Sequence, residues 1–97
     1  MNVAETVRKK REQILNVATA YGAYNVRVIG SVARGEADEQ SDIDFLVSIG
    51  PAFSLMDHVR LEEELEQLLG RKVDVVSDGS LKRPRFRRRV LGEAVPL

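Results

Sequence analysis

The sequence predicts an α+β domain in which about four helices pack against a three-stranded mixed β-sheet. Three short runs rich in β-branched residues predict the strands, at residues 25–29, 42–47 and 72–76. Segments with apolar residues at helical spacing lie before, between and after these runs. The 24 residues between the second and third strands can form a right-handed crossover, which predicts a parallel pair. The shorter link between the first two strands favours an antiparallel pair.

Local signals predict where the helices begin and end. The first helix is expected over residues 3–21, the second runs up to Gly70, and the last ends near Gly92. A single helical turn is expected directly after the first strand. The start signals are a capping box of Asn2 with Glu5, a second cap of Ser54 with Asp57, and Pro84 at the first position of the last helix.

Length and composition indicate one small domain. A chain of 97 residues buries only about 60 to 65% of its unfolded surface, so residues 1–97 are expected to form a single domain. Apolar residues make up 43% of the chain, enough for a core. No apolar run approaches the roughly 18 residues that span a bilayer, and the amino terminus has no signal segment. We therefore expect a cytoplasmic protein with no membrane partner.

The chain has no cysteine and a formal net charge of zero. Without thiolates, a metal would need oxygen ligands or the single His58, which favours Mg²⁺ or Mn²⁺. Zero net charge argues against nucleic acid as the main partner of the whole surface. A basic cluster at residues 82–89 leaves that partner open, because it places six cations in eight residues. The cluster can bind phosphate, RNA or an acidic partner, or be a solvated helix face that Phe86 packs down.

The stretch from residue 28 to residue 47 carries the candidate chemistry. Gly30 and Ser31 lie where the first strand ends, a polar loop follows, and Asp42 and Asp44 open the second strand. Alternation of apolar and other residues there predicts a strand with one buried face. Both aspartates are then expected to project from the same face.

A third acid, Asp74, lies in the third predicted strand. Parallel strands align their entrances, and Asp44 and Asp74 are each the third residue of their strand, so we expect their carboxylates side by side. Converging carboxylates repel one another unless cations neutralise them, and hard divalent ions are the natural partner. Two Mg²⁺ ions held by Asp42, Asp44 and Asp74 can stabilise both oxygens of a displacement at phosphorus.

Each feature also has an ordinary structural explanation. An Asp-x-Asp pair on a strand is usually a solvated edge, and Asp74 can be an exposed alternating residue. Arg34, a candidate for neutralising triphosphate charge, can instead pair with Glu36 or Asp38. The coincidence of a glycine turn with three acids at neighbouring strand ends favours a functional site.

The pattern Gly-Ser, ten residues, Asp-x-Asp resembles the signature of the DNA polymerase β-like nucleotidyltransferases. The fuller form GSxARGxxxxxSDxD is especially similar to their minimal branch, the minimal nucleotidyltransferases (MNT). The resemblance implies the nucleotidyltransferase fold, ATP as substrate and two Mg²⁺ ions. It implies that the catalytic and metal-binding residues are Asp42, Asp44 and Asp74. The nucleotide-binding residues that it implies are Gly30, Ser31, Arg34, Gly35 and Ser41.

The resemblance also implies a role and a partner. Proteins of this group typically accompany a HEPN-domain ribonuclease toxin, and they look like antitoxins that transfer AMP from ATP to a tyrosine of that toxin. The short chain leaves no residues for an acceptor-binding domain of its own, which agrees with an acceptor on a partner protein. Two alternatives remain: an antitoxin that masks the toxin without chemistry, and a nucleotidyltransferase acting on a small molecule such as an aminoglycoside.

Overall fold

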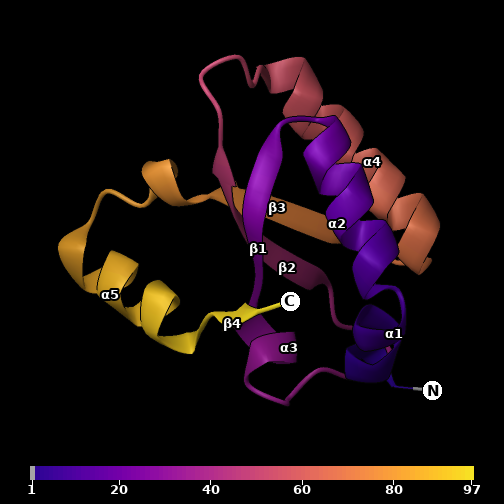
Figure 1. Ribbon diagram of the computed structural model, residues 1–97. Coiled ribbons are helices and arrows are strands. Elements are labelled where there is room, and N and C mark those ends of the chain that lie inside the picture. The colour runs from indigo at the N-terminus through magenta and orange to yellow at the C-terminus, as the bar shows by residue number, and fades with distance from the viewer. Residues whose placement is uncertain (1) are drawn as a thin grey trace.

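Helices and strands alternate along most of the chain in the computed structural model, which describes residues 2–97 (Figure 1). The elements, in chain order, are α1 (Val3–Lys9), α2 (Arg11–Ala20), β1 (Ala23–Ile29), α3 (Gly30–Ala33), β2 (Ile43–Ile49), α4 (Leu55–Leu69), β3 (Val73–Ser77), the 3₁₀ helix η1 (Asp78–Ser80), α5 (Pro84–Glu93) and β4 (Val95–Pro96).

The sheet has four strands in the order β3-β2-β1-β4. The predicted pairings are confirmed, because β1 and β2 are antiparallel and β2 and β3 are parallel. The prediction of three strands is wrong: Val95 and Pro96 pair with Val28 and Arg27 at the other edge of β1. A two-residue strand is too short for any alternating pattern. Only pairing with a segment far away in the sequence makes it a strand.

The helix predicted over residues 3–21 is in fact two helices that meet at Lys10. Val7 of α1 and Ile14 of α2 are both buried, so the apolar spacing predicts the buried positions correctly. The Lys10 ammonium donates to the carbonyl of Leu68 at 2.6 Å, which joins the junction to the end of α4. Figure 1 shows α1 turned away from the line of α2. No proline or glycine lies at this junction to announce it in the sequence.

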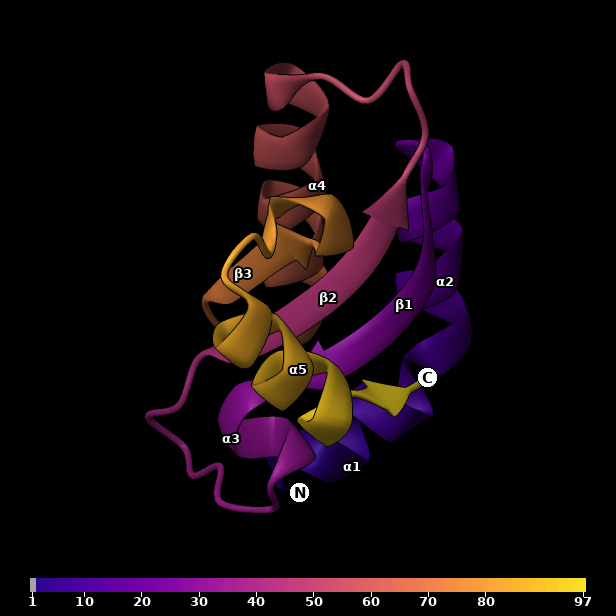
Figure 2. The same ribbon diagram turned by 90° about the vertical axis from the view of Figure 1, so that its left-hand side faces the viewer.

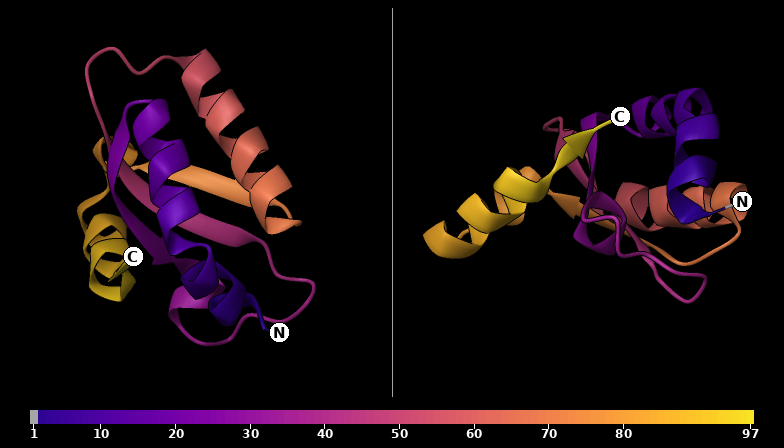
Figure 3. Two further views of the ribbon diagram at one scale, coloured as in Figure 1. Left: turned by 45° about the vertical axis from the view of Figure 1, so that its right-hand side comes forward. Right: turned by 90° about the horizontal axis from the view of Figure 1, so that it is seen from below.

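The helices lie on both faces of the sheet. Seen from below, α1, α2 and α4 lie on one side and α5 on the other (Figure 3). The larger core joins Ile14 and Leu61 to Phe45. A smaller core on the α5 side contains Leu46 and Val90, so β2 does not have the single buried face that its sequence predicted. Leu46 is fully buried because α5 and the segment before it cover that face.

Helix α4 has the ends that its sequence predicts. Ser54 and Asp57 form a reciprocal capping box, and Gly70 ends the helix in the left-handed conformation at φ 71°. Two acids of α4 have a role that the sequence did not reveal. The carboxylates of Glu62 and Glu66 accept from the backbone N–H groups of Val75 and Val73 at 2.7 and 3.2 Å. They therefore satisfy donors along the outer edge of β3, where no further strand pairs.

A polar cluster ties η1 to the two central strands. The Asp78 carboxylate accepts from the Ser48 hydroxyl at 2.6 Å and from the Arg27 guanidinium at 3.2 Å. The pKa of Asp78 is lowered, mainly by the hydrogen bond from Ser48 and to a smaller extent by Arg27. We call Arg27, Ser48 and Asp78 the Asp78 cluster.

Helix α5 is held by few contacts. Val90 is its only fully buried residue, and residues 82–89 are all exposed. Phe86 is 49% exposed, so it is not the residue that packs the helix down. Leu81 and Val90 do that instead. No helix within residues 2–97 is both long enough and apolar enough to cross a membrane.

Candidate active site

Two of the predicted acids meet where the parallel strands β2 and β3 begin. Asp44 in β2 is the register partner of Asp74 in β3, which confirms that the two lie side by side. Both residues are partly buried. Asp42 is exposed and lies one residue before β2, so it belongs to the end of the preceding loop.

The carboxyl group of Asp44 has an acidic environment. Burial raises its pKa, and the negative charges of Asp74 and Asp42 raise it further. The positive charge of Arg34 lowers the pKa of Asp44, but it is the smallest of these influences. The raised pKa means that the surroundings destabilise the charged form. A cation placed among these acids would relieve that repulsion.

The acids fit a hard divalent ion by their donor chemistry. Within residues 2–97, no three acidic, histidine or cysteine side chains stand close enough to form a ready ligand group. Asp44 and Asp74 nevertheless supply neighbouring carboxylates, and Asp42 is close enough to influence the pKa of Asp44. Mg²⁺ keeps several of its waters and needs only one or two carboxylates from a protein. The three aspartates therefore suit Mg²⁺ or Mn²⁺.

Gly30 joins the glycine turn to the acids. Its φ is 71°, and a Cβ added there would lie 2.5 Å from Oδ2 of Asp44. Glycine permits a close approach to the backbone, and the group that approaches Gly30 is the Asp44 carboxylate. Any side chain at this position would displace that carboxylate. Gly30 therefore positions the Asp44 carboxylate, and this role is independent of any contact between Gly30 and a nucleotide.

Ser31 and Gly35 shape the turn that follows. Ser31 lies in α3, and its carbonyl accepts from the N–H of Glu36 at 2.9 Å. Gly35 has the left-handed φ of 72°, and nothing lies within 4 Å of the place of its Cβ. The backbone conformation alone therefore favours glycine at this position.

Arg34 is held by two carboxylates. Its Nε donates to Glu36 at 3.0 Å and its Nη1 to Glu93 at 3.2 Å. The pairing with Glu36 is one of the alternatives that the sequence left open. Glu93 was not anticipated: it comes from the end of α5, and its second oxygen accepts from the N–H of Gly30 at 3.1 Å. No local pattern could have indicated a contact across 63 residues.

Ser41 supports the loop that leads to Asp42. Its hydroxyl accepts from the N–H of Asp38 at 3.0 Å and lies 3.2 Å from the Asp38 carboxylate. Arg71, which the sequence did not single out, donates to the carbonyls of Asp38 and Ser41 at 3.1 and 2.8 Å. These bonds fix the backbone directly before Asp42. A nucleotide-binding role of Ser41 stays a prediction.

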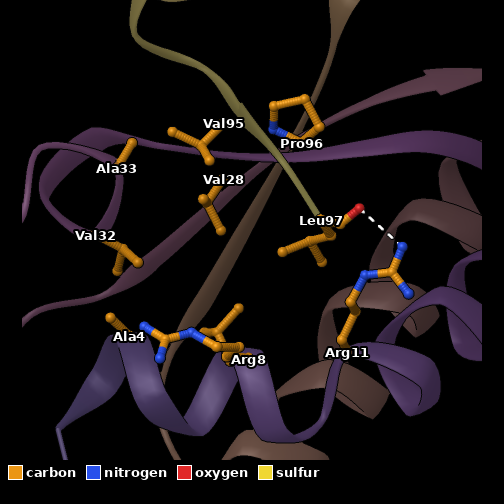
Figure 4. Close-up of a pocket in the computed structure, with 10 residues that line it drawn as sticks. Ala4, Arg8, Arg11, Val28, Val32, Ala33, Val95, Pro96 and Leu97 are labelled. Carbon is orange, nitrogen blue, oxygen red and sulfur yellow. Dashed lines mark hydrogen bonds between the residues drawn. The ribbon is translucent and has the colours of Figure 1, made fainter.

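A cavity of about 250 Å³ lies away from the acids, between α1, β1, α3 and β4 (Figure 4). Its lining is mainly apolar, with Arg8 and Arg11 on one side, and Arg11 donates to the carbonyl of Leu97 at 3.1 Å. None of the predicted site residues lines it. It is also smaller than the roughly 300 to 1,000 Å³ of common ligand pockets. The candidate site is therefore the surface around the glycine turn and the acids.

Comparison with known proteins agrees with this geometry. Residues 7–97 match the family described as nucleotidyltransferase domain. A candidate protein adenylyltransferase of Methanocaldococcus jannaschii is 43% identical over 95 residues, covering 98% of this chain and 97% of that protein. The protein adenylyltransferase MntA of Thermococcus cleftensis is 43% identical over 79 residues, covering 73% of this chain and 80% of that protein.

Solved structures share the fold. A candidate minimal nucleotidyltransferase superposes with a TM-score of 0.88 at 52% identity, covering all of this chain and 97% of that one. A toxin-antitoxin complex with AMP-PNP contains a chain that superposes with a TM-score of 0.74, covering 88% of this chain and 69% of that one. The identity there is 20%, so that likeness shows the fold alone.

The chain therefore belongs to the nucleotidyltransferase domain family and has the α+β fold of that family. Within the family it is a minimal nucleotidyltransferase, as the GSxARGxxxxxSDxD resemblance implied. It is a transferase enzyme whose relatives are named protein adenylyltransferases.

Proposed function

We propose that the protein is an ATP- and Mg²⁺-dependent protein adenylyltransferase that acts as the antitoxin of a HEPN-domain ribonuclease toxin. The acceptor in this proposal is a tyrosine hydroxyl of the toxin. The observation that carries it is the pairing of Asp44 with Asp74 beside the Gly30 turn. The names of the adenylyltransferase relatives, and the toxin-antitoxin complexes among the structures of the same fold, support it.

The proposed reaction is a single displacement at the α-phosphorus of ATP. The acceptor oxygen forms a bond to that phosphorus, the bond from the phosphorus to the α,β-bridging oxygen breaks, and pyrophosphate leaves. The hydroxyl proton is lost to the acids, and Asp74 is the residue proposed to favour this step. Asp42, Asp44 and Asp74 would hold two divalent ions, which when bound neutralise the acids and stabilise the attacking and leaving oxygens.

The remaining site residues orient the triphosphate in this proposal. The turn formed by Gly30 and Ser31 offers backbone N–H groups and a hydroxyl, the donors that suit phosphate oxygens. Arg34 adds a positive charge beside that turn, and Gly35 lets the chain turn back. Ser41 is proposed to contribute from the loop that leads to Asp42.

The direct test is transfer of AMP to the partner. The protein is incubated with ATP, Mg²⁺ and the toxin encoded beside it, and the toxin is weighed by intact-mass spectrometry. We expect an AMP-sized addition that maps to a tyrosine, and no addition with the Asp42→Asn, Asp44→Asn double variant. Absence of any addition, in a mixture where the two proteins bind each other, would refute the proposal.

Masking without chemistry is the alternative that this variant also tests, and the exposed basic residues 82–89 are the observation that favours it. If the folded double variant neutralises the toxin as well as the wild type does, masking is the better account. Turnover of an aminoglycoside with no partner present would favour a small-molecule acceptor instead. A single domain over residues 1–97 and a cytoplasmic location stay predictions.

A further inference from the structure

Glu93 makes a contact that the catalytic role of the site does not explain. Its carboxylate accepts from the Gly30 N–H at 3.1 Å with one oxygen, and from Arg34 at 3.2 Å with the other. The Glu93 side chain is 22% exposed, so this is a well-defined contact of a largely covered side chain. Both donors are groups that we assign to the triphosphate of ATP. An anion of the protein itself thus occupies part of the place proposed for the anion of the substrate.

We propose that Glu93 competes with the phosphates of the nucleotide for the Gly30 turn and Arg34, and that nucleotide binding displaces it and loosens the carboxyl-terminal end of α5. The inference rests on the proposed function only in taking that turn as the phosphate subsite. A carboxylate and a phosphate cannot share the same two donors at close range without strong repulsion. Glu93 must therefore move when the phosphates arrive.

The placement of Glu93 makes its release consequential for α5. The helix is attached through buried Val90, through hydrogen bonds of Arg87 to the carbonyls of Asp78 and Leu81, and through Glu93. Strand β4, which follows it, pairs with β1 and stays in place when Glu93 is released. Figure 2 shows the end of α5 close to α3, which carries Gly30. Loss of the Glu93 contacts removes the attachment to α3. The helix released in this way carries most of the exposed basic cluster.

The size of the competition follows from the ion pair. A partly exposed ion pair favours the arrangement in which Glu93 contacts Arg34 by up to about fivefold over the arrangement in which it is released. Only the released arrangement binds the phosphates, so the apparent Kd equals the intrinsic Kd divided by the fraction of molecules in that arrangement. We therefore expect Glu93→Gln to bind phosphate ligands roughly fivefold more tightly than the wild type, and Glu93→Ala at least as tightly as that. If Glu93 instead held Arg34 ready for the phosphates, both variants would bind more weakly.

The binding experiment uses inorganic tripolyphosphate and a non-hydrolysable ATP analogue with Mg²⁺, titrated by calorimetry. Glu63→Gln is the control, because it makes the same charge change on an exposed face of α4. Glu36→Gln is a comparison variant, since it removes the other carboxylate partner of Arg34 and leaves the Gly30 contact in place, and it measures the part of any tightening that comes from Arg34 alone. Tightening by the Glu93 variants beyond that of Glu36→Gln and Glu63→Gln supports the inference. Unchanged or weaker binding overturns it.

Hydrogen exchange of the wild type tests the same idea without a variant. Amides of residues 90–94, at the carboxyl-terminal end of α5, should exchange faster when tripolyphosphate is bound, and equal or slower exchange would overturn the inference. The AMP-transfer assay fails or succeeds independently. Tighter binding by Glu93→Gln with no transfer to the toxin would leave the competition standing and remove the proposed function. Transfer of AMP to the toxin, with no tighter phosphate binding by Glu93→Gln, would leave the proposed function standing and overturn the competition.

Discussion

Replacement of Gly30 by alanine tests whether this glycine positions the Asp44 carboxylate. The added Cβ would lie 2.5 Å from Asp44 Oδ2, so the carboxylate must move by about 1 Å to reach an ordinary contact. A displacement of that size at a reacting centre can cost about a hundredfold in rate. We therefore expect Gly30→Ala to lower the rate of AMP transfer by about two orders of magnitude.

The stability cost has a matched control in Gly70→Ala. Both glycines have φ 71°, but nothing lies within 4 Å of the place of the Gly70 Cβ. The left-handed conformation should cost each variant about 1 to 2 kcal/mol, because alanine is strained there. At roughly 4 to 8 °C per kcal/mol for a domain of this size, both should show a lower Tm in calorimetry.

The difference between the two variants isolates the contact with Asp44. Gly70→Ala should lose stability but keep its transfer rate when assayed well below its Tm. Gly30→Ala should lose both. Equal transfer rates of the two folded variants, or a Gly30→Ala structure with Asp44 unmoved, would refute the assignment of Gly30 as the residue that positions this carboxylate.

Three further predictions concern stability. Because the pKa of Asp44 is raised in the folded state, ionisation of Asp44 destabilises the fold as pH rises through that pKa. Metal-free Asp44→Asn should therefore have a higher Tm than the wild type at pH 7 while losing transfer activity, and a lower Tm would contradict the prediction. Glu62→Ala removes the partner of the Val75 N–H, so it should lower the free energy of unfolding in urea by about 1 to 3 kcal/mol and increase self-association through the open edge of β3. Glu63→Ala, at an exposed position, should do neither. The pKa of Asp78 is lowered in the folded state, so its carboxylate stabilises the fold above the unfolded pKa of about 3.9, and this stabilisation is lost as pH falls through the folded pKa. Asp78→Asn should therefore be less stable than the wild type at pH 7 but approach its stability in acid. A stability difference that does not change with pH would count against this account.

The predictions from sequence succeeded where the controlling interaction is local. The capping box at Ser54 and the left-handed Gly70 follow from backbone groups that residues a few positions away must satisfy. The pairing of Asp44 with Asp74 also followed from the sequence, since a crossover of that length makes the strands parallel and aligns their starts. The residue identities of the signature stretch then indicated the family.

The features that sequence could not indicate depend on contacts between distant segments. The second buried face of β2 exists because Leu46 meets α5, and β4 exists because its backbone meets β1. The Asp78 cluster and the edge-capping Glu62 likewise join separate elements. Such contacts leave no periodic trace, because each needs only one suitable side chain at a place that the whole fold determines.

The sequence by itself determined the elements of the sheet core and the identity of the acids, since hydrophobic period and capping chemistry act over a few residues. Only the tertiary structure decided that Asp44 leaves no room for a side chain at residue 30, and that Glu93 occupies the donors of the same turn. Both facts are matters of distance between atoms of different elements, and packing sets those distances after the chain has folded.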